Sequence, residues 1–202
     1  MNGACLVHDF ELAWAGSTSE DVGPGLDRGL FGMARETGDF LNRASAAGVA
    51  AGQGLGLAVG TAITRARLRF RKTSILAAAA RTGIPATVHV AIGTDIIHMH
   101  PGADGAAIGE GSLRDFRLFA GVVARLAGGV FVNLGSAVIL PEVFVKALNL
   151  PRNVGHPVRD LTTVDMDFIR QYRPGVNVVA RPTAAGGLGI RLTGHHEIMF
   201  PL

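Results

Sequence analysis

The sequence predicts an α/β protein with a mostly parallel sheet and helices on both faces. Short apolar, β-branched runs alternate with longer helical patterns, which is typical of β-α units. The chain has 202 residues, about the length of one ordinary domain. Apolar residues make up 48% of it and charged residues 17%, a balance that excludes intrinsic disorder. We therefore expect one globular domain, residues 1–202.

Five short runs have the composition of buried strands. Each is apolar, contains β-branched or aromatic residues, and is bounded by glycine, proline or polar residues. The expected strands are residues 4–8, 86–92, 129–134, 176–181 and 197–200.

Capping residues predict where the first helices begin. Ser19 precedes two acidic residues that suit the positive start of a helix. Thr73 or Ser74 caps a helix over 75–81, and Gly83 ends it.

Two later segments are also predicted to be helical. Ser112 is expected to cap an amphipathic helix over 113–126. The uncharged run 44–65 approaches bilayer-spanning length, but it is mostly Ala and Gly and carries Gln53. We expect a buried, closely packed helix there and no association with a membrane.

Cysteine content and the start of the chain suggest a cytoplasmic protein. Cys5 is the only cysteine, so an internal disulfide framework and a cysteine-built zinc site are excluded. Residues 1–4 run directly into the first expected strand, without a basic and apolar leader.

The basic residues form one local cluster. The formal net charge is only +3, although the sequence pI is about 9.7. Aromatic interleaving is limited to Phe70, so we expect a solvated or inter-subunit surface and no nucleic-acid partner. The cluster consists of Arg65, Arg67, Arg69, Arg71 and Lys72.

A strand, a small-residue turn and a helix follow one another over residues 130–150. The turn is Gly135-Ser136-Ala137, and Pro141 suits the first turn of the helix. In parallel sheets, ligands bind at the carboxyl ends of strands, where small residues let a cofactor approach backbone N–H groups.

Other polar loops are expected to lie at the same rim of the sheet. The first comprises Gly16, Ser17, Thr18, Ser19 and Glu20, which follow the first expected strand. Its small residues could receive a dinucleotide phosphate or ribose, although a capped helix start explains them equally well.

The segment 98–110 is rich in glycine and reads as a loop. It carries His98, His100, Asp104 and Glu110, with Gly105 beside the first acid. A loop with two histidines and two acids is more often functional than structural.

Two further groups complete the candidates. Thr162 and Thr163 begin the polar stretch 162–167, which a helix-capping role could also explain. His195 and His196 precede the last apolar segment. Two histidine pairs raise the alternative of a metal site, but adjacent residues of a strand point in opposite directions.

Common catalytic and nucleotide motifs are missing. The glycines between 54 and 60 do not follow a predicted strand, so we discount them as a dinucleotide fingerprint. The sequence contains no Gly-x-Ser-x-Gly elbow, Walker-type loop or His-Glu-x-x-His helix.

Together these loops resemble the deoxyhypusine synthase-like superfamily. The resemblance rests on AGSTSEDVG at 15–23, Asp104-Gly105 with Gly109-Glu110, LGSAVI at 134–139, Arg152-Asn153, Thr162-Thr163 and the closing HEIMFPL at 196–202. It implies a Rossmann-like fold with bound NAD, a small-molecule substrate and a homo-oligomer, either dimer or tetramer.

Departures from the family pattern limit what the resemblance implies. The family's nucleophilic lysine lies in a Trp-Gly-Lys segment, which is replaced here by VVARP at 178–182. The guanidinium of Arg181 cannot form an imine at neutral pH. Pro141-Glu142 replaces the family's His-His. We therefore expect no deoxyhypusine synthase activity, and a domain that is shortened at its N-terminus.

Our leading hypothesis is an NAD-dependent oxidoreductase or transferase that acts on a small amine or alcohol. The alternatives are a non-catalytic oligomeric ligand-binding subunit and a histidine-ligated metal-dependent hydrolase. The candidates for proton transfer are His98, His100, Asp104, Glu110, His195 and His196. The candidates for cofactor binding are Gly16, Ser17, Thr18, Ser19, Glu20, Gly105, Gly135, Ser136, Ala137, Thr162 and Thr163.

Overall fold

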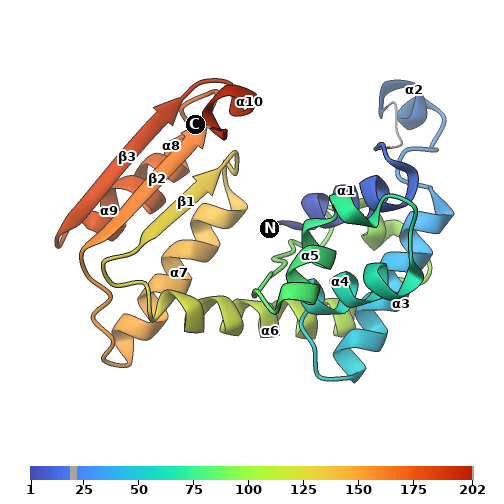
Figure 1. Ribbon diagram of the computed structural model, residues 1–202. Helices are drawn as coiled ribbons and strands as arrows, with labels where there is room; N and C mark the ends of the chain where they lie inside the picture. Colours follow the sequence, from blue (N-terminus) through green and yellow to red (C-terminus); the bar gives the residue numbers. More distant parts are fainter. Residues whose placement is uncertain (19–21, 202) are drawn as a thin grey trace. The chain divides into compact units, whose positions relative to one another are not determined.

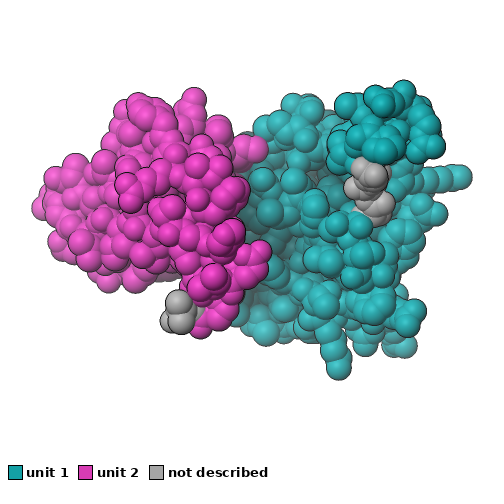
Figure 2. Space-filling model, turned by 90° about the horizontal axis from the view of Figure 1, so that it is seen from above, with its two compact units in different colours: residues 1–116 teal, residues 117–202 magenta. Residues whose placement is uncertain are grey.

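The computed structural model describes residues 1–18 and 22–201. The chain divides into two compact units, Met1–Phe116 and Arg117–Leu202 (Figure 2). The expectation of a single domain stays a prediction.

Unit 1 is helical. Its core contains Leu6, Phe10, Leu41, Ile63 and Leu76, all at most 2% exposed. Its elements are α1 (Gly3–Ala15), α2 (Val22–Asp27), α3 (Arg35–Ala50), α4 (Leu55–Ala66), η1 (Arg71–Thr73), α5 (Ile75–Thr82) and η2 (Ile96–Met99), and α6 (Gly105–Val123) begins in it (Figure 1).

The strand predicted at 4–8 is wrong, because these residues lie in α1. The side chain of Asn2 caps the helix by accepting a hydrogen bond from the Cys5 N–H at 2.9 Å. The buried residues Leu6, Phe10 and Ala13 recur at helical spacing. A short apolar run cannot by itself distinguish the periodicity of a strand from that of a helix. The spacing of the buried residues over the whole segment identifies the helix.

The strand predicted at 86–92 is also wrong. Only one isolated bridge forms there, between Asn2 and His89. Side chains of α6 replace a neighbouring strand as hydrogen-bond partners. Asp115 accepts from the Val88 N–H at 2.8 Å, and Ser112 accepts from the Val90 N–H at 3.2 Å.

The single helix expected over 44–65 is two helices, α3 and α4, bent by 116° at the break between them. In the described part of the chain, no single helix is long and apolar enough to cross a membrane. This bent pair passes the same test of length and composition.

The prediction for α5 is confirmed, whereas that for α6 is corrected. Ser74 caps α5 by accepting from the Ala77 N–H at 2.9 Å, and Gly83 ends the helix. In α6, Ser112 lies inside the helix instead of capping it. The helix begins at Gly105, within the segment that we expected to be a loop.

Unit 2 is built on a three-stranded sheet in the order β1-β2-β3, with both strand pairs parallel. This confirms the predicted α/β class with a parallel, Rossmann-like sheet. Its elements are β1 (Val130–Leu134), α7 (Ile139–Asn153), β2 (Leu161–Asp167), α8 (Tyr172–Pro174), η3 (Gly175–Ala180), α9 (Arg181–Thr183), β3 (Gly187–Thr193) and α10 (His196–Met199) (Figure 1).

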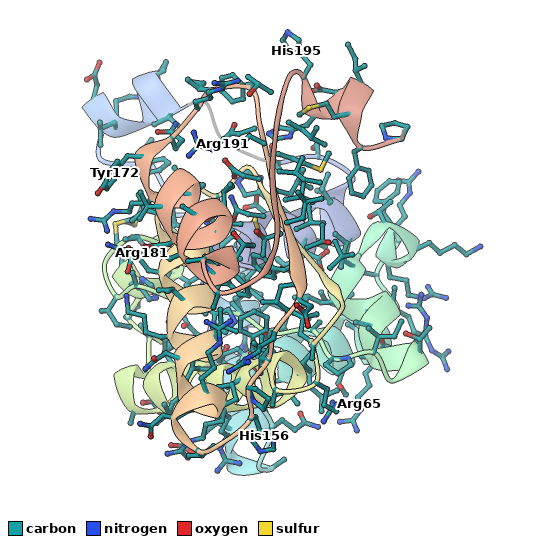
Figure 3. The ribbon with its side chains drawn as sticks, turned by 90° about the vertical axis from the view of Figure 1, so that its left-hand side faces the viewer. Arg65, His156, Tyr172, Arg181, Arg191 and His195 are labelled. Carbon is teal, nitrogen blue, oxygen red and sulfur yellow. The ribbon has the colours of Figure 1, made fainter. Side chains whose placement is uncertain are left out.

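Two strands predicted for this unit are wrong. Residues 176–181 lie in a continuous helical run from α8 to α9, whose middle is the π-helical turn η3 (Figure 3). Residues 197–200 lie in and just after α10. The strand predicted at 129–134 is confirmed as β1, whereas β2 and β3 were not predicted.

The described helices of unit 2 pack against one face of this sheet and not against the other. Phe131 stacks on Phe144 of α7 with ring centroids 3.6 Å apart, and Gly189 packs against η3. These residues share one face of the sheet. The alternate positions carry apolar side chains that are 43–59% exposed, namely Val130, Val132, Leu134, Leu188 and Leu192. Within unit 2 the helices therefore cover one face.

Candidate functional site

The carboxyl ends of the three strands form one edge of unit 2. The register pairs Leu134 with Met166 and Asp167 with Thr193, so the turns after the strands lie along the same edge. Two backbone hydrogen bonds join them. The Gly135 N–H donates to the Met166 carbonyl at 2.9 Å, and the Gly194 N–H donates to the Asp167 carbonyl at 3.1 Å.

The turn after β1 has the conformation expected of a small-residue turn. Gly135 has φ +67°, and a Cβ atom there would lie 3.2 Å from Nε2 of His196. Ser136 Oγ accepts a hydrogen bond from the Leu140 N–H at 3.1 Å. Ala137 and the N-cap residue Val138 follow, so the turn leads into the positive end of α7.

Asn133 and Asp165 form a buried polar pair on the helix-covered face. The Asn133 amide donates to Asp165 Oδ1 at 2.8 Å and to the Ser136 carbonyl at 3.0 Å. Burial raises the pKa of Asp165, and the charge of Asp167 adds to the rise, whereas the Asn133 hydrogen bond and Arg191 oppose it. The pair holds the turn against β2.

Asp167 ends β2 beside the glycine turn. It is 6% exposed, and its Oδ1 accepts from the Phe168 N–H at 2.8 Å. Nε2 of His196 lies 3.7 Å from the same oxygen. The ring of His196 meets Phe168 edge to face, and its Nδ1 has no hydrogen-bond partner among the described atoms. A carboxylate and an imidazole thus face the turn.

The other candidates in unit 2 lie elsewhere. Thr162 and Thr163 pair with Val130 and Phe131, at the amino-terminal end of the sheet and away from Gly135. The stretch 162–167 forms β2, so the helix-capping interpretation is wrong. His195 is exposed at the turn beyond β3, where it points outward (Figure 3).

The first predicted loop, in unit 1, follows a helix and not a strand. Gly16 caps α1 in the left-handed conformation, and its N–H donates to the Leu12 carbonyl at 3.1 Å. Ser17 and Thr18 are exposed. Ser19 and Glu20 lie outside the described residues.

The side chains of the two histidines of the second predicted loop are within hydrogen-bond distance of backbone atoms. Nδ1 of His98 accepts from the N–H groups of Gly93 at 3.1 Å and Asp95 at 3.3 Å, so its proton lies on Nε2. Nε2 of His100 lies 2.9 Å from the Gly32 carbonyl oxygen.

The two acids of the same loop form hydrogen bonds within the first turns of helix α6. Asp104 Oδ1 accepts from the N–H groups of Ala106 and Ala107 at 2.9 and 3.1 Å, which caps the helix. Gly105 is its first residue. Glu110 pairs with Arg114 at 2.6 Å, one turn further along.

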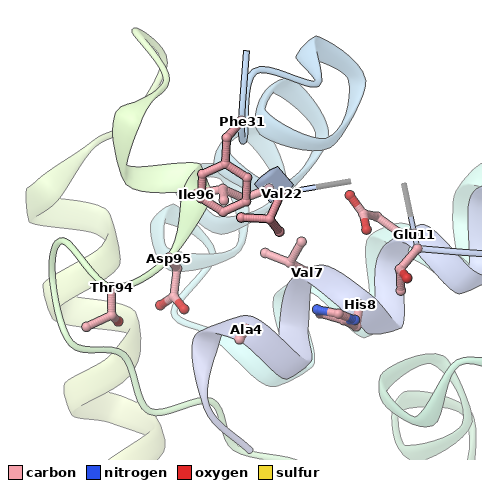
Figure 4. Close-up of a pocket in the computed structure, with 10 residues that line it drawn as sticks. Ala4, Val7, His8, Glu11, Val22, Phe31, Thr94, Asp95 and Ile96 are labelled. Carbon is pink, nitrogen blue, oxygen red and sulfur yellow. The ribbon is translucent and has the colours of Figure 1, made fainter. Parts of the chain in front are cut away.

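Unit 1 contains a pocket of about 250 Å³ that the sequence did not indicate (Figure 4). Two of its residues are buried acids, Glu11 at 4% and Asp95 at 8% exposure. Burial raises the pKa of Asp95, whereas His98 and Thr94 oppose the rise. Its Oδ2 has no hydrogen-bond partner among the described atoms. The remaining lining residues are Ala4, Val7, His8, Thr18, Val22, Phe31, Thr94 and Ile96.

Sequence reasoning missed Asp167 and Asp95 as site residues. A signal for Asp167 was present, since an acid ends the strand that follows a glycine turn and its helix. Nothing in the sequence relates Asp95 to α1.

The described residues contain no group of three or more His, Cys, Asp or Glu side chains placed to hold a metal ion. No family model matches the chain, and no curated protein or solved structure matches it. The resemblance to the deoxyhypusine synthase-like superfamily therefore stays a prediction.

Proposed function

We propose that the strand-end edge of unit 2 binds NAD. The observation that carries this proposal is the β1-α7-β2 unit, in which a left-handed glycine turn lies beside a buried acid at the end of the neighbouring parallel strand. In dinucleotide-binding folds the first turn takes the pyrophosphate, and the acid at the end of the next strand binds ribose hydroxyls.

The residues present fit these two tasks. Gly135, Ser136 and Ala137 would hold the phosphates at the start of α7, and Asp167 would accept hydrogen bonds from the ribose. When bound, NAD supplies a hydride acceptor. His196 would accept the proton at this edge, because its Nδ1 has no hydrogen-bond partner among the residues that the structure describes.

Calorimetric titration with NAD tests the proposal directly. Asp167→Asn is expected to weaken binding about tenfold or more, because a hydrogen bond to a charged group contributes about 1.5–3 kcal/mol. NADP should bind more weakly than NAD, since its 2′-phosphate would approach two buried acids. Asp160→Asn is the matched control, with the same chemical change before the start of β2.

Absence of binding at millimolar NAD would refute the proposal. So would equal affinity of the Asp167→Asn and Asp160→Asn variants. Binding of NAD does not distinguish an enzyme from a binding subunit, so turnover is measured separately. The alternative of a non-catalytic binding subunit predicts that NAD binds without reduction in the presence of any small amine or alcohol.

A second candidate function is favoured by the pocket of unit 1. Among the described atoms its Asp95 Oδ2 has no partner, and it lies with Glu11 among apolar walls, which suits a small organic cation. We propose a short aliphatic amine as its ligand. Titration with 1,4-diaminobutane should show saturable binding that Asp95→Asn weakens, whereas butyrate should not bind. Equal affinity for the diamine and butyrate would refute this role.

A further inference from the structure

A second groove of unit 1 has an apolar lining and plays no part in the functions proposed above. It measures about 460 Å³, within the range of about 300–1,000 Å³ typical of small-molecule sites. It lies where α1, α3, α4 and the segment after α4 meet. Its apolar lining consists of Phe10, Trp14, Phe40, Ala44, Ala62 and Leu68.

One wall of this groove is aromatic. Phe10 of α1 stacks on Phe40 of α3, with ring centroids 4.3 Å apart and planes inclined by 20°. Trp14 continues the wall, 6.0 Å from Phe10 and nearly parallel to it. Phe10 is buried, but Trp14 is 39% exposed. The groove therefore offers apolar contact area that a ligand could remove from water.

The basic segment 65–72 reaches the groove through Leu68, which lines it. Arg67 and Arg69 are the neighbours of Leu68 in the chain, and the guanidinium of Arg69 lies 5.0 Å from the centroid of the Phe70 ring. This segment is fixed to the end of α1 that carries Trp14. The Phe70 N–H donates to the Ala13 carbonyl at 2.9 Å, and the Phe70 ring packs on Gly16.

The positive charge of the cluster is not neutralised by the described part of the chain. No described carboxylate forms an ion pair with its four arginines or with Lys72. The opposite rim, on α3, is nearly balanced. Asp39 pairs with Arg43 at 3.2 Å and with Arg35 at 3.5 Å. Of the charged residues of this rim, Glu36 and Arg43 line the groove.

We propose that this groove binds an anionic amphiphile. The ligand's apolar body lies against the aromatic wall, and its acid group faces the guanidinium groups of Arg67 and Arg69. Charge complementarity selects an anion, since the five cations of the cluster outweigh Glu36. A nucleic acid is disfavoured because Trp14 is the one ring of the wall with a large exposed area.

The sole tryptophan of the chain is Trp14, so its fluorescence reports on this groove. Titration with decanoate should change the emission saturably. The affinity should rise about fourfold per methylene from octanoate to decanoate. Acetate lacks the apolar body and decylammonium has the opposite charge, so both should bind at least tenfold more weakly.

Substitutions test the apolar part and the charged part of the site separately. Ala62→Leu fills the groove, and Arg67→Gln with Arg69→Gln removes charge, so each change should weaken decanoate binding tenfold or more. Arg81→Gln with Arg117→Gln, two changes on exposed helix surface, is the charge-matched control and should have no effect. Circular dichroism checks folding, and Ala44→Val replaces Ala62→Leu if that variant does not fold.

Three results would overturn the proposal. The first is unchanged Trp14 emission in millimolar decanoate. The second is equal affinity for decanoate and decylammonium, which would show an apolar patch without charge selection. The third is binding of an oligothymidylate that Ala62→Leu leaves unaffected and that competes with decanoate, which would show a general anion surface.

Discussion

The buried carboxylate of Asp9 joins α1 to the start of α5, and its removal should destabilise unit 1. Asp9 is 7% exposed. Its Oδ1 accepts from the Ile75 N–H at 2.7 Å. Its Oδ2 accepts from the Ser74 hydroxyl at 2.6 Å and from the Leu76 N–H at 3.3 Å. A side chain 65 residues away thus supplies the helix start with its acceptor.

The magnitude follows from these contacts. The two short bonds to a charged acceptor contribute about 1.5–2 kcal/mol each. The bond to Leu76 is long, so we neglect it. Asp9→Ala should therefore lower the free energy of unfolding by about 3–4 kcal/mol, and Asp9→Asn, which keeps one acceptor oxygen, by about half as much.

Urea unfolding followed by Trp14 fluorescence measures this effect, because Trp14 lies on the same helix as Asp9. With a slope of about 2 kcal/mol per molar urea, Asp9→Ala should lower the midpoint by about 1.5–2 M. The exposed Asp27→Ala serves as the control, with an expected change below about 0.5 kcal/mol. A loss smaller than about 1 kcal/mol for Asp9→Ala would refute the assigned role.

Three further predictions concern packing and pH. Phe144→Ala removes a fully buried ring from unit 2 and should cost about 3–5 kcal/mol, measured by thermal unfolding; a cost near zero would contradict the described core. Gly60→Val should abolish stable folding of unit 1, because a Cβ atom there would lie 2.3 Å from the Leu76 carbonyl oxygen; a folded variant by circular dichroism would contradict this packing. Burial lowers the pKa of His89 to about 4 from 6.5, and the N-terminal amine adds to the effect. Neutral His89 is favoured in the folded state, so its contribution is intact above pH 6.5 and is lost as the pH falls toward 4. Relative to His89→Gln, the native protein should lose up to about 3 kcal/mol over that range, and a constant difference would show that the imidazole is not buried as described.

Local signals predicted the elements whose ends are marked in the sequence. The helix α5 has a serine cap and a terminal glycine, and β1 is a β-branched run followed by Gly135. The missed strand β3 also had a readable signal, because Leu188, Ile190 and Leu192 alternate with small or polar residues.

Tertiary contacts decided the elements that were predicted wrongly. The segment 86–92 has the composition of a strand, but Asp115 and Ser112 supply its backbone partners. In 176–181, Asn177 binds Glu142 at 2.7 Å and Arg181 at 2.8 Å, and these side-chain bonds accompany a helical turn in a β-branched sequence.

The candidate site was predictable only in part. Parallel strands bring the turns that follow them to one edge, which places Gly135 beside His196, but β3, the strand that leads to His196, was not predicted. Asp104 and His100 were chosen for their chemistry, but the structure uses them to cap a helix and to contact a carbonyl. Residue type alone cannot separate a capping acid from a catalytic one.

The apolar face of the sheet has a consequence for calorimetry. Its side chains, such as Val132 and Leu188, are already hydrated in the folded chain. Hydration of newly exposed apolar area is the main source of the heat-capacity increase on unfolding. Unit 2 should therefore show a smaller heat-capacity increment than its number of residues would suggest, and any molecule that shields this face should raise the increment.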